Sequence, residues 1–303
     1  MDKFYEIHFE ITDKCLLDCR HCSSFPMLGK NDRNMFIADM VKLIDLLDCK
    51  THLYLTGGEP LFSETILEDI KFIKQNTTDT NIGLFTCGIN GTFSPISVEF
   101  GMHLKSIGIK DCFFSIYHKD QKIHNYITNK PNAYEIIMKS ISNLFNAGIK
   151  IKVNLVLNKY NYLELDEIID HLDSLEMIHG IRLLRLVRGG NAEKNWEDLG
   201  LSFKNQNSVI LKIMENNKKY DFNITVAGFP DVFPCRPFEN SIKCQAGICL
   251  LYVTFEGYLF PCACVKNKKP FLIGHISDSK AIMKFLHNIE GRKYNDYCFN
   301  QEF

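Results

Sequence analysis

Near its N-terminus the chain carries the stretch ITDKCLLDCRHC, Ile11–Cys22, which decides its fold. Its three cysteines, Cys15, Cys19 and Cys22, have the spacing CxxxCxxC and follow directly on the β-rich run Tyr5–Ile11. A cubane iron-sulfur cluster prefers a cysteine on each of its irons, so a loop with three cysteines leaves one iron open for a chelating ligand. The spacing therefore predicts a catalytic iron-sulfur site in the loop after the first strand.

Six β-rich runs alternate with amphipathic helical segments along the first two thirds of the chain. These runs are Tyr5–Ile11, His52–Thr56, Asn81–Thr86, Cys112–Tyr117, Lys150–Leu157 and Ile181–Val187. Between them, one helical face collects Ile37, Met40, Val41, Ile44 and Leu47, and another collects Tyr134, Ile137, Ile141, Leu144 and Phe145. Such alternation implies a parallel sheet with right-handed crossovers, whose chemistry lies at the C-terminal ends of the strands. The sequence thus predicts an α/β fold, a partial (β/α)6 TIM-type barrel.

The alternation stops after the polar stretch Gly189–Asn195. A helix predicted near Phe203–Lys218 then leads into a segment that is richer in cysteine. We therefore place a domain boundary near residue 220, with the barrel over residues 1–220 and a small α+β unit over residues 221–303.

The composition sets limits on the partners. The 303 residues are 46% hydrophobic with a formal net charge of -1, so the chain can bury a large core. It shows no basic stripe interleaved with aromatic residues, so no nucleic-acid partner is expected. No signal peptide and no run of roughly 18 apolar residues is visible, which predicts a cytoplasmic protein with no membrane partner. In reducing surroundings the 12 cysteines point to metal sites, with Cys49 and Cys112 expected as buried fillers.

A second motif follows the second predicted strand, where the chain reads Thr56-Gly57-Gly58-Glu59-Pro60. Together with the cysteine loop, it resembles the radical S-adenosylmethionine (radical SAM) superfamily, whose glycine-rich segment binds the methionine amino group of the cofactor. Physically, the glycines let backbone carbonyls approach a ligand with no Cβ in the way. The resemblance implies that residues 57–60 bind the cofactor.

Weaker matches follow the later strands. Cys87, in Phe85-Thr86-Cys87-Gly88, departs from the Thr-Asn-Gly common in relatives and is expected at the mouth of the active site. Ser115 and Asn154 resemble the strand-end residues that contact cofactor ribose or carboxylate in relatives, and each also fits an ordinary polar strand position. The family chemistry would be reductive cleavage of S-adenosylmethionine by a [4Fe-4S] cluster to a 5'-deoxyadenosyl radical, which abstracts hydrogen from substrate.

A second group of cysteines lies near the C-terminus. The segment Cys244–Cys264 reads as a β-hairpin with a tight turn at Glu256-Gly257. It resembles the auxiliary-cluster domains called SPASM or, in a shorter form, twitch; a full SPASM domain would have a dense run of cysteines near the end, so the twitch form with one auxiliary [4Fe-4S] cluster is implied. The implied ligands are Cys244, Cys262 and Cys298, with the fourth left open among Cys264, Cys249 and Cys235.

Zinc is the alternative at both cysteine groups. Zinc sites usually repeat a CxxC pair, and no second pair or histidine pair lies near the first group, which favours iron there. A small unit often needs a metal staple, so a zinc-stabilised hairpin stays open for the second group. The GTP cyclase of molybdopterin synthesis has a somewhat similar cysteine spacing, but its Gly-Gly tail is not found in this sequence, so we rank it below the twitch interpretation.

Relatives with such a second unit mostly modify peptides or proteins, and some dehydrogenate sugars. We therefore expect a peptide substrate, modified by epimerisation or by thioether or carbon-carbon crosslinking, with a small electron-donor protein such as flavodoxin or ferredoxin. The alternatives are a dehydrogenase or cyclase of a sugar or nucleotide, and a metal-binding scaffold. Cys264 should point to the opposite face of the strand from Cys262; it is either a hydrogen donor to the substrate radical or the fourth ligand.

Overall fold

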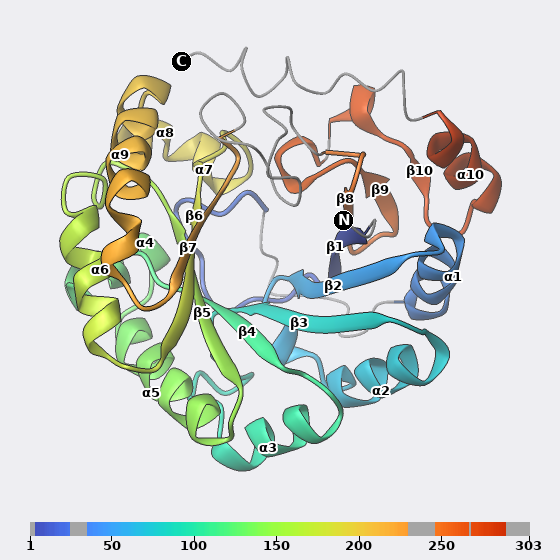
Figure 1. Cartoon of the computed structure of the whole chain (residues 1–303), viewed down its shortest axis with the longest axis horizontal. Helices are drawn as coiled ribbons and strands as arrows, with labels where there is room; N and C mark the ends of the chain where they lie inside the picture. The colour runs from blue at the N-terminus through green and yellow to red at the C-terminus, as the bar shows by residue number, and fades with distance from the viewer. Residues whose placement is uncertain (1–3, 25–34, 230–245, 267, 289–303) are drawn as a thin grey trace.

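The computed structural model describes residues 4–24, 35–229, 246–266 and 268–288 (Figure 1). Their ten strands form one sheet in the order β10-β9-β8-β1-β2-β3-β4-β5-β6-β7, and all neighbours from β8 through β1 to β7 are parallel. The strands are β1 (Phe4–Thr12), β2 (Lys50–Gly57), β3 (Thr80–Thr86), β4 (Asp111–Ser115), β5 (Lys150–Val156), β6 (Ile178–Leu184), β7 (Asn223–Ala227), β8 (Leu250–Val253), β9 (Tyr258–Phe260) and β10 (Gly274–His275). The α/β class and the partial barrel are thus confirmed, with the six predicted runs as β1 to β6.

Helices connect the parallel strands, and α2, α3, α5, α6 and α9 lie around the outside of the curled sheet (Figure 1). The helices are α1 (Ile37–Leu47), α2 (Ile66–Asn76), α3 (Val98–Ser106), α4 (Gln121–Thr128), α5 (Ala133–Asn146), α6 (Leu165–Ser174), α7 (Asn191–Lys194), α8 (Trp196–Leu199), α9 (Phe203–Asn216) and α10 (Ser279–His287). The predicted apolar face of α1 is buried along its whole length. On α5 the prediction is partly wrong, because Phe145 is 37% exposed at the end of the helix.

The two expected filler cysteines pack differently. Cys112, in β4, is fully buried, as predicted. Cys49 is only partly buried and packs against the edge of the core, because it lies in the short connection between α1 and β2.

An ion pair crosses the interior of the curled sheet. Glu6 on β1 and Arg182 on β6 are separated by four strands in the sheet, yet Oε1 of Glu6 lies 3.0 Å from Nη1 of Arg182. The sheet must therefore curve far enough to bring β1 and β6 face to face. Its inner surface encloses a lumen whose residues alternate along each strand with those that contact the helices.

The predicted hairpin is confirmed, with β8 and β9 antiparallel around a turn where Gly257 has a φ of 84°. The prediction left out two features of this region. β8 pairs in parallel with β1, so the C-terminal segment shares the barrel sheet. β7 follows the expected boundary at residue 220 and pairs with β6; it buries only Ile224 and Val226, too few to form a clear alternating pattern. The division into two domains near residue 220 stays a prediction.

Candidate active site

The three cysteines of the CxxxCxxC motif lie in the loop after β1. The amide of Cys22 donates to the carbonyl of Cys19 over 3.1 Å, which closes a tight turn between the last two cysteines. Burial raises the pKa of the Cys19 thiol well above its ordinary value, and the charges of Cys15 and Cys22 raise it further. The three thiols therefore lie near one another, although among the described residues no three such side chains are close enough to hold a single metal ion. A bound cluster would overcome this raised pKa, since metal coordination deprotonates a thiol outright.

Gly57 and Gly58, at the end of β2, pack against the backbone at the start of the cysteine loop. A Cβ on Gly57 would meet the carbonyl oxygen of Thr12 at 2.1 Å, and a Cβ on Gly58 would meet that of Lys14 at 2.0 Å. The amide of Gly58 donates to Thr12 O (2.8 Å), and the amide of Glu59 to Lys14 O (2.7 Å). The glycines are therefore needed for close packing against the start of the cysteine loop, a reason that differs from the approach to a ligand expected from the sequence.

Glu59 is buried, and its carboxylate oxygens accept hydrogen bonds from protein donors. It accepts hydrogen bonds from the amide of Leu61 (2.9 Å), the hydroxyl of Thr86 (2.5 Å) and the amide of Cys87 (2.6 Å). Burial raises its pKa in spite of these bonds. Glu59 thus joins the loops after β2 and β3. Burial raises the pKa of the Cys87 thiol well above its ordinary value, and the neighbouring Cys15 raises it further.

The segment after β6 cradles the cysteine loop from another side. A Cβ on Gly190 would lie 2.7 Å from the carbonyl oxygen of Cys22, and the amide of Ala192 donates to the same oxygen over 3.2 Å. The side chain of Asn191 donates to Asp18 over 2.7 Å. From the sequence, the polar stretch Gly189–Asn195 was expected only to end the alternation. Gly190, Asn191 and Asn195 in this stretch pack against or bond to the cysteine loop.

A cavity of about 350 Å³ opens beside the cysteine loop, at the C-terminal ends of the strands. It brings together six of the predicted site residues: Cys22, Gly57, Ser115, Asn154, Cys262 and Cys264. Ser115, Asn154 and Arg182 are register partners on β4, β5 and β6, so they form one polar row on the wall. Asn154 is buried, and its Oδ1 has no hydrogen-bond partner within the described residues. A row with such an acceptor suits a ligand with hydroxyl or ammonium groups.

Three charged or titratable residues at the lumen end of the cavity were missed from the sequence: Glu6, His8 and Arg182. His8 Nε2 lies 2.7 Å from Glu6 Oε1, and the Arg182 guanidinium lies 4.6 Å from the ring centre of Phe113. Burial alone would raise the pKa of Glu6, but Arg182 and His8 outweigh it and hold the pKa well below the ordinary range. The lumen end is therefore closed by a charged, hydrogen-bonded group.

A buried histidine lies behind the cysteine loop and gives a pH prediction. His124 stacks on Tyr117, and its Nδ1 accepts the Tyr117 amide over 3.3 Å. Burial lowers its pKa to about 3. In the unfolded chain a histidine has a pKa of about 6.5. Between pH 6.5 and pH 3, roughly, the unfolded chain therefore binds a proton at this residue and the folded chain does not, so the free energy of unfolding falls as the pH falls. The parent protein should lose unfolding free energy between pH 7 and pH 5, and in His124→Asn this loss should be smaller by about 2 kcal/mol.

Urea unfolding at the two pH values measures this difference. His103→Asn, which removes an exposed imidazole on α3, is the matched control. An identical loss in the parent protein and in His124→Asn would contradict the prediction.

The second cysteine group is described in part. Cys262 is buried and Cys264 is half-buried, and both belong to a small apolar cluster with Ala246 and Val265. Cys249 is also buried. In the part of the chain that the structure describes, no three His, Cys, Asp or Glu side chains group closely enough to hold one metal ion. Three predicted ligands lie outside the described residues: Cys235, Cys244 and Cys298.

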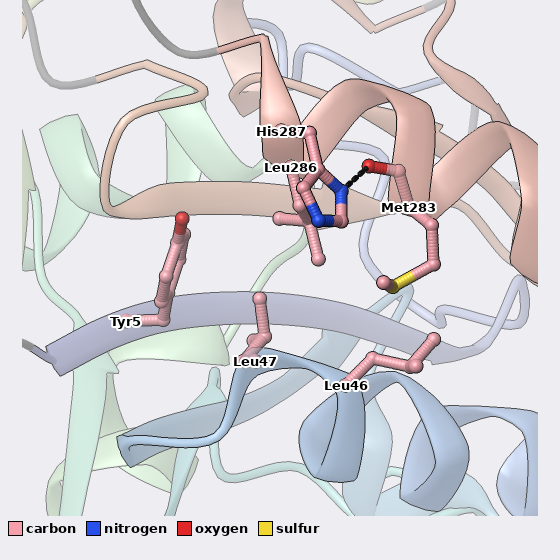
Figure 2. Close-up of a pocket in the computed structure, with 6 residues that line it drawn as sticks. All are labelled: Tyr5, Leu46, Leu47, Met283, Leu286 and His287. Carbon is pink, nitrogen blue, oxygen red and sulfur yellow. Dashed lines mark hydrogen bonds between the residues drawn. The ribbon is translucent and has the colours of Figure 1, made fainter.

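A smaller groove, of about 190 Å³, lies near the start of β1 (Figure 2). In it, Leu46 and Leu47 from the end of α1 face Met283 and Leu286 from α10. The Nδ1 atom of His287 is hydrogen-bonded to the carbonyl oxygen of Met283 over 2.7 Å. The groove offers no group of reactive side chains, so the candidate site is the larger cavity. In the described ranges, every helix is too short or too polar to cross a bilayer.

The chain is similar in sequence to several known proteins. A sequence model of the Radical SAM superfamily matches residues 9–172. The chain is 26% identical over 266 residues to a "Probable GTP 3',8-cyclase" of Methanococcus aeolicus, covering 84% of each chain. It is 26% identical over 157 residues to an AdoMet-dependent heme synthase of Nitratidesulfovibrio vulgaris, covering 51% of this chain and 41% of that protein.

Solved structures share the fold at lower identity. SuiB of Streptococcus suis bound to S-adenosylmethionine superposes with a TM-score of 0.69 at 14% identity, over 99% of this chain and 71% of SuiB. The protein anSMEcpe with bound AdoMet superposes with a TM-score of 0.64 at 13% identity, over 94% of this chain and 79% of that one. The likeness includes the barrel and most of the segment that follows it.

Proposed function

The chain belongs to the radical SAM superfamily, and from this premise we propose that it abstracts a hydrogen atom from a peptide substrate and so modifies that peptide. Membership implies a [4Fe-4S] cluster and S-adenosylmethionine. The proposal assigns the cluster to Cys15, Cys19 and Cys22, whose thiols lie near one another in the loop after β1. When bound, these groups supply a 5'-deoxyadenosyl radical.

The residues around the cavity suit the cofactor. Gly57, Ser115 and Asn154 line the same cavity as Cys22. Ser115 and Asn154 can orient hydroxyl groups or an ammonium group, and the unpartnered Oδ1 of Asn154 is available as an acceptor. The role of residues 57–60 is then twofold, since they support the cysteine loop and Gly57 also forms part of the cavity wall.

One observation carries the proposal for the substrate: Cys22 and Cys264 line the same cavity, although they come from opposite ends of the chain. A substrate held between them meets the radical source on one side and a thiol or an auxiliary cluster on the other. The modification of peptides is supported by structural likeness to SuiB bound to its precursor peptide SuiA and to anSMEcpe bound to the Cp18Cys peptide. We assign the auxiliary cluster to Cys244, Cys262 and Cys298, and electron delivery to a protein of the flavodoxin or ferredoxin class.

A second candidate is a cyclase of a nucleotide. It is favoured by the similarity to GTP 3',8-cyclases over 84% of the chain and by three cationic residues on the cavity wall, Arg182, Arg185 and Lys266. A triphosphate would use such cations. All three already have internal partners, since Arg182 pairs with Glu6, Lys266 pairs with Glu10, and Arg185 donates to Asn207 over 2.7 Å.

The two candidates are separated by one experiment. The anaerobically reconstituted protein is incubated with S-adenosylmethionine and dithionite, either with GTP or with a library of short synthetic peptides. We expect 5'-deoxyadenosine release to rise with the peptides and to yield a peptide product of altered mass or stereochemistry. A rise with GTP and formation of a cyclised nucleotide would replace the peptide proposal with the second candidate.

Cys264 is the proposed hydrogen donor. Its S–H bond gives a hydrogen atom to the substrate carbon radical, and the thiyl radical left behind takes up one electron from the flavodoxin- or ferredoxin-class donor and one proton from water. Cys264→Ala should therefore keep its iron and its 5'-deoxyadenosine release, but should place no deuterium in the product in heavy water.

Iron analysis and mass spectrometry of the product measure these effects. Cys49→Ala, a change outside both cysteine groups, is the control and should keep the deuterium label. Lower iron in Cys264→Ala, from the roughly eight irons expected for two cubanes, would reject the donor and identify Cys264 as the fourth ligand.

A further inference from the structure

A buried lysine joins the C-terminal hairpin to the barrel. The Lys266 Nζ lies 2.9 Å from Glu10 Oε1 on β1 and 3.0 Å from the Tyr252 hydroxyl on β8. It also donates to the hydroxyl of Ser24, in the cysteine loop. An ammonium group has three donors, so each of them has an acceptor here.

The acceptors are linked to one another as well. Tyr252 donates its hydroxyl hydrogen to Glu10 while it accepts from Lys266, and the second carboxylate oxygen of Glu10 accepts the amide of Phe255 over 2.9 Å. The side chains of Lys266 and Glu10 are 6% and 12% exposed. Burial by itself lowers the pKa of Lys266, but Tyr252 and Glu10 outweigh it and raise the pKa, so the group stays charged. A buried ion pair with this many bonds holds its geometry.

The network reaches a proposed cluster ligand in two steps. Lys266 donates to the hydroxyl of Ser24, and the amide of Ser24 donates to the sulfur of Cys22 over 3.4 Å. The Lys266 ammonium group therefore lies near this sulfur and stabilises negative charge there, while the Glu10 carboxylate, 2.9 Å from the ammonium group, acts in the opposite sense.

We propose that Lys266 is a positioning residue for the cluster, which fixes the Cys22 end of the cysteine loop through Ser24 and sets the reduction potential of the cluster together with Glu10. The proposal rests on the assignment of the cluster to Cys15, Cys19 and Cys22. Reduction adds an electron to the cluster, so a nearby positive charge favours it and a nearby negative charge opposes it. Removing Lys266 or Glu10 must then shift the potential in opposite directions.

The test is a redox titration of the reconstituted holoenzyme, followed by electron paramagnetic resonance. The cluster concerned is identified by the change in its signal when S-adenosylmethionine is added, which separates it from an auxiliary cluster. Lys266→Met should lower the midpoint potential and Glu10→Gln should raise it. Lys266→Arg, which keeps the charge, should stay near the parent value. Lys212→Met, which removes an exposed lysine on α9, is the control.

Shifts of opposite sign support the proposal. Shifts of the same sign, or none in either variant, overturn it, because a merely structural network would act on both variants alike. If Lys266→Met binds no cluster, Glu10→Gln decides alone: a raised potential supports the proposal, and an unchanged or lowered one overturns it. A parent protein with no signal that responds to S-adenosylmethionine would contradict the cluster assignment itself, independently of Lys266.

Discussion

Replacing Cys15, Cys19 and Cys22 together by alanine is expected to abolish the release of 5'-deoxyadenosine under reducing, anaerobic conditions. With two or fewer thiols left in the loop a cubane would lose too many ligands, and with none the loop has no means to hold it. The measurement is chromatographic detection of 5'-deoxyadenosine, with iron content determined on the same samples.

The control is Cys49→Ala, because Cys49 is partly buried between α1 and β2 and belongs to neither cysteine group. This variant should cleave the cofactor like the parent protein. Cleavage above background in the triple variant would show that the cluster is held elsewhere, and the proposed site would have to be abandoned.

Gly58→Ala should cause the second largest loss, for a steric reason. The added Cβ would lie 2.0 Å from the carbonyl oxygen and 2.4 Å from the carbonyl carbon of Lys14, and both are backbone atoms that no side-chain rotation can move away. The start of the cysteine loop must shift, so both Cys15 and the wall of the cofactor site move. Overpacking of this kind costs about 1–3 kcal/mol of unfolding free energy. We expect cofactor cleavage to fall roughly tenfold or more, since a misplacement of about 1 Å near the reacting groups can cost about a hundredfold in rate.

Gly189→Ala is the matched control, because a Cβ at Gly189 would have no heavy atom within 4 Å. Thermal unfolding and 5'-deoxyadenosine release are measured for both variants. Equal behaviour of the two alanine variants would contradict the role of Gly58 in supporting the loop.

The sequence was sufficient for those parts of the fold that are written in local patterns. The alternating runs predicted β1 to β6, and the stripe on α1 predicted which side of that helix is buried. The hairpin at Glu256-Gly257 was equally visible, because a positive φ at a turn favours glycine. Each of these predictions needs only residues that are close to one another in the chain.

Contacts between distant segments could not be predicted in this way. Glu6, His8 and Glu10 do alternate with apolar residues along β1, which indicates that one face of the strand is polar. Nothing in that pattern identifies Arg182 or Lys266 as their partners, because those pairs depend on how far the sheet curls and on where β8 docks. The packing role of Gly57 and Gly58 could not be predicted either, because only the structure shows that the Lys14 carbonyl lies against Gly58.

The pairing of β8 with β1 has a consequence for how the protein matures. β1 lies between β2 and β8 in the sheet, so one edge of the N-terminal strand has its hydrogen-bonding groups unmatched until the C-terminal segment has been synthesised. Contacts between such distant parts of a chain form slowly. Lys266 and Ser24 likewise meet only at that last stage. Ribosome-bound chains that stop before β8 are therefore expected to take up iron poorly, and cofactor loading should follow release of the finished polypeptide.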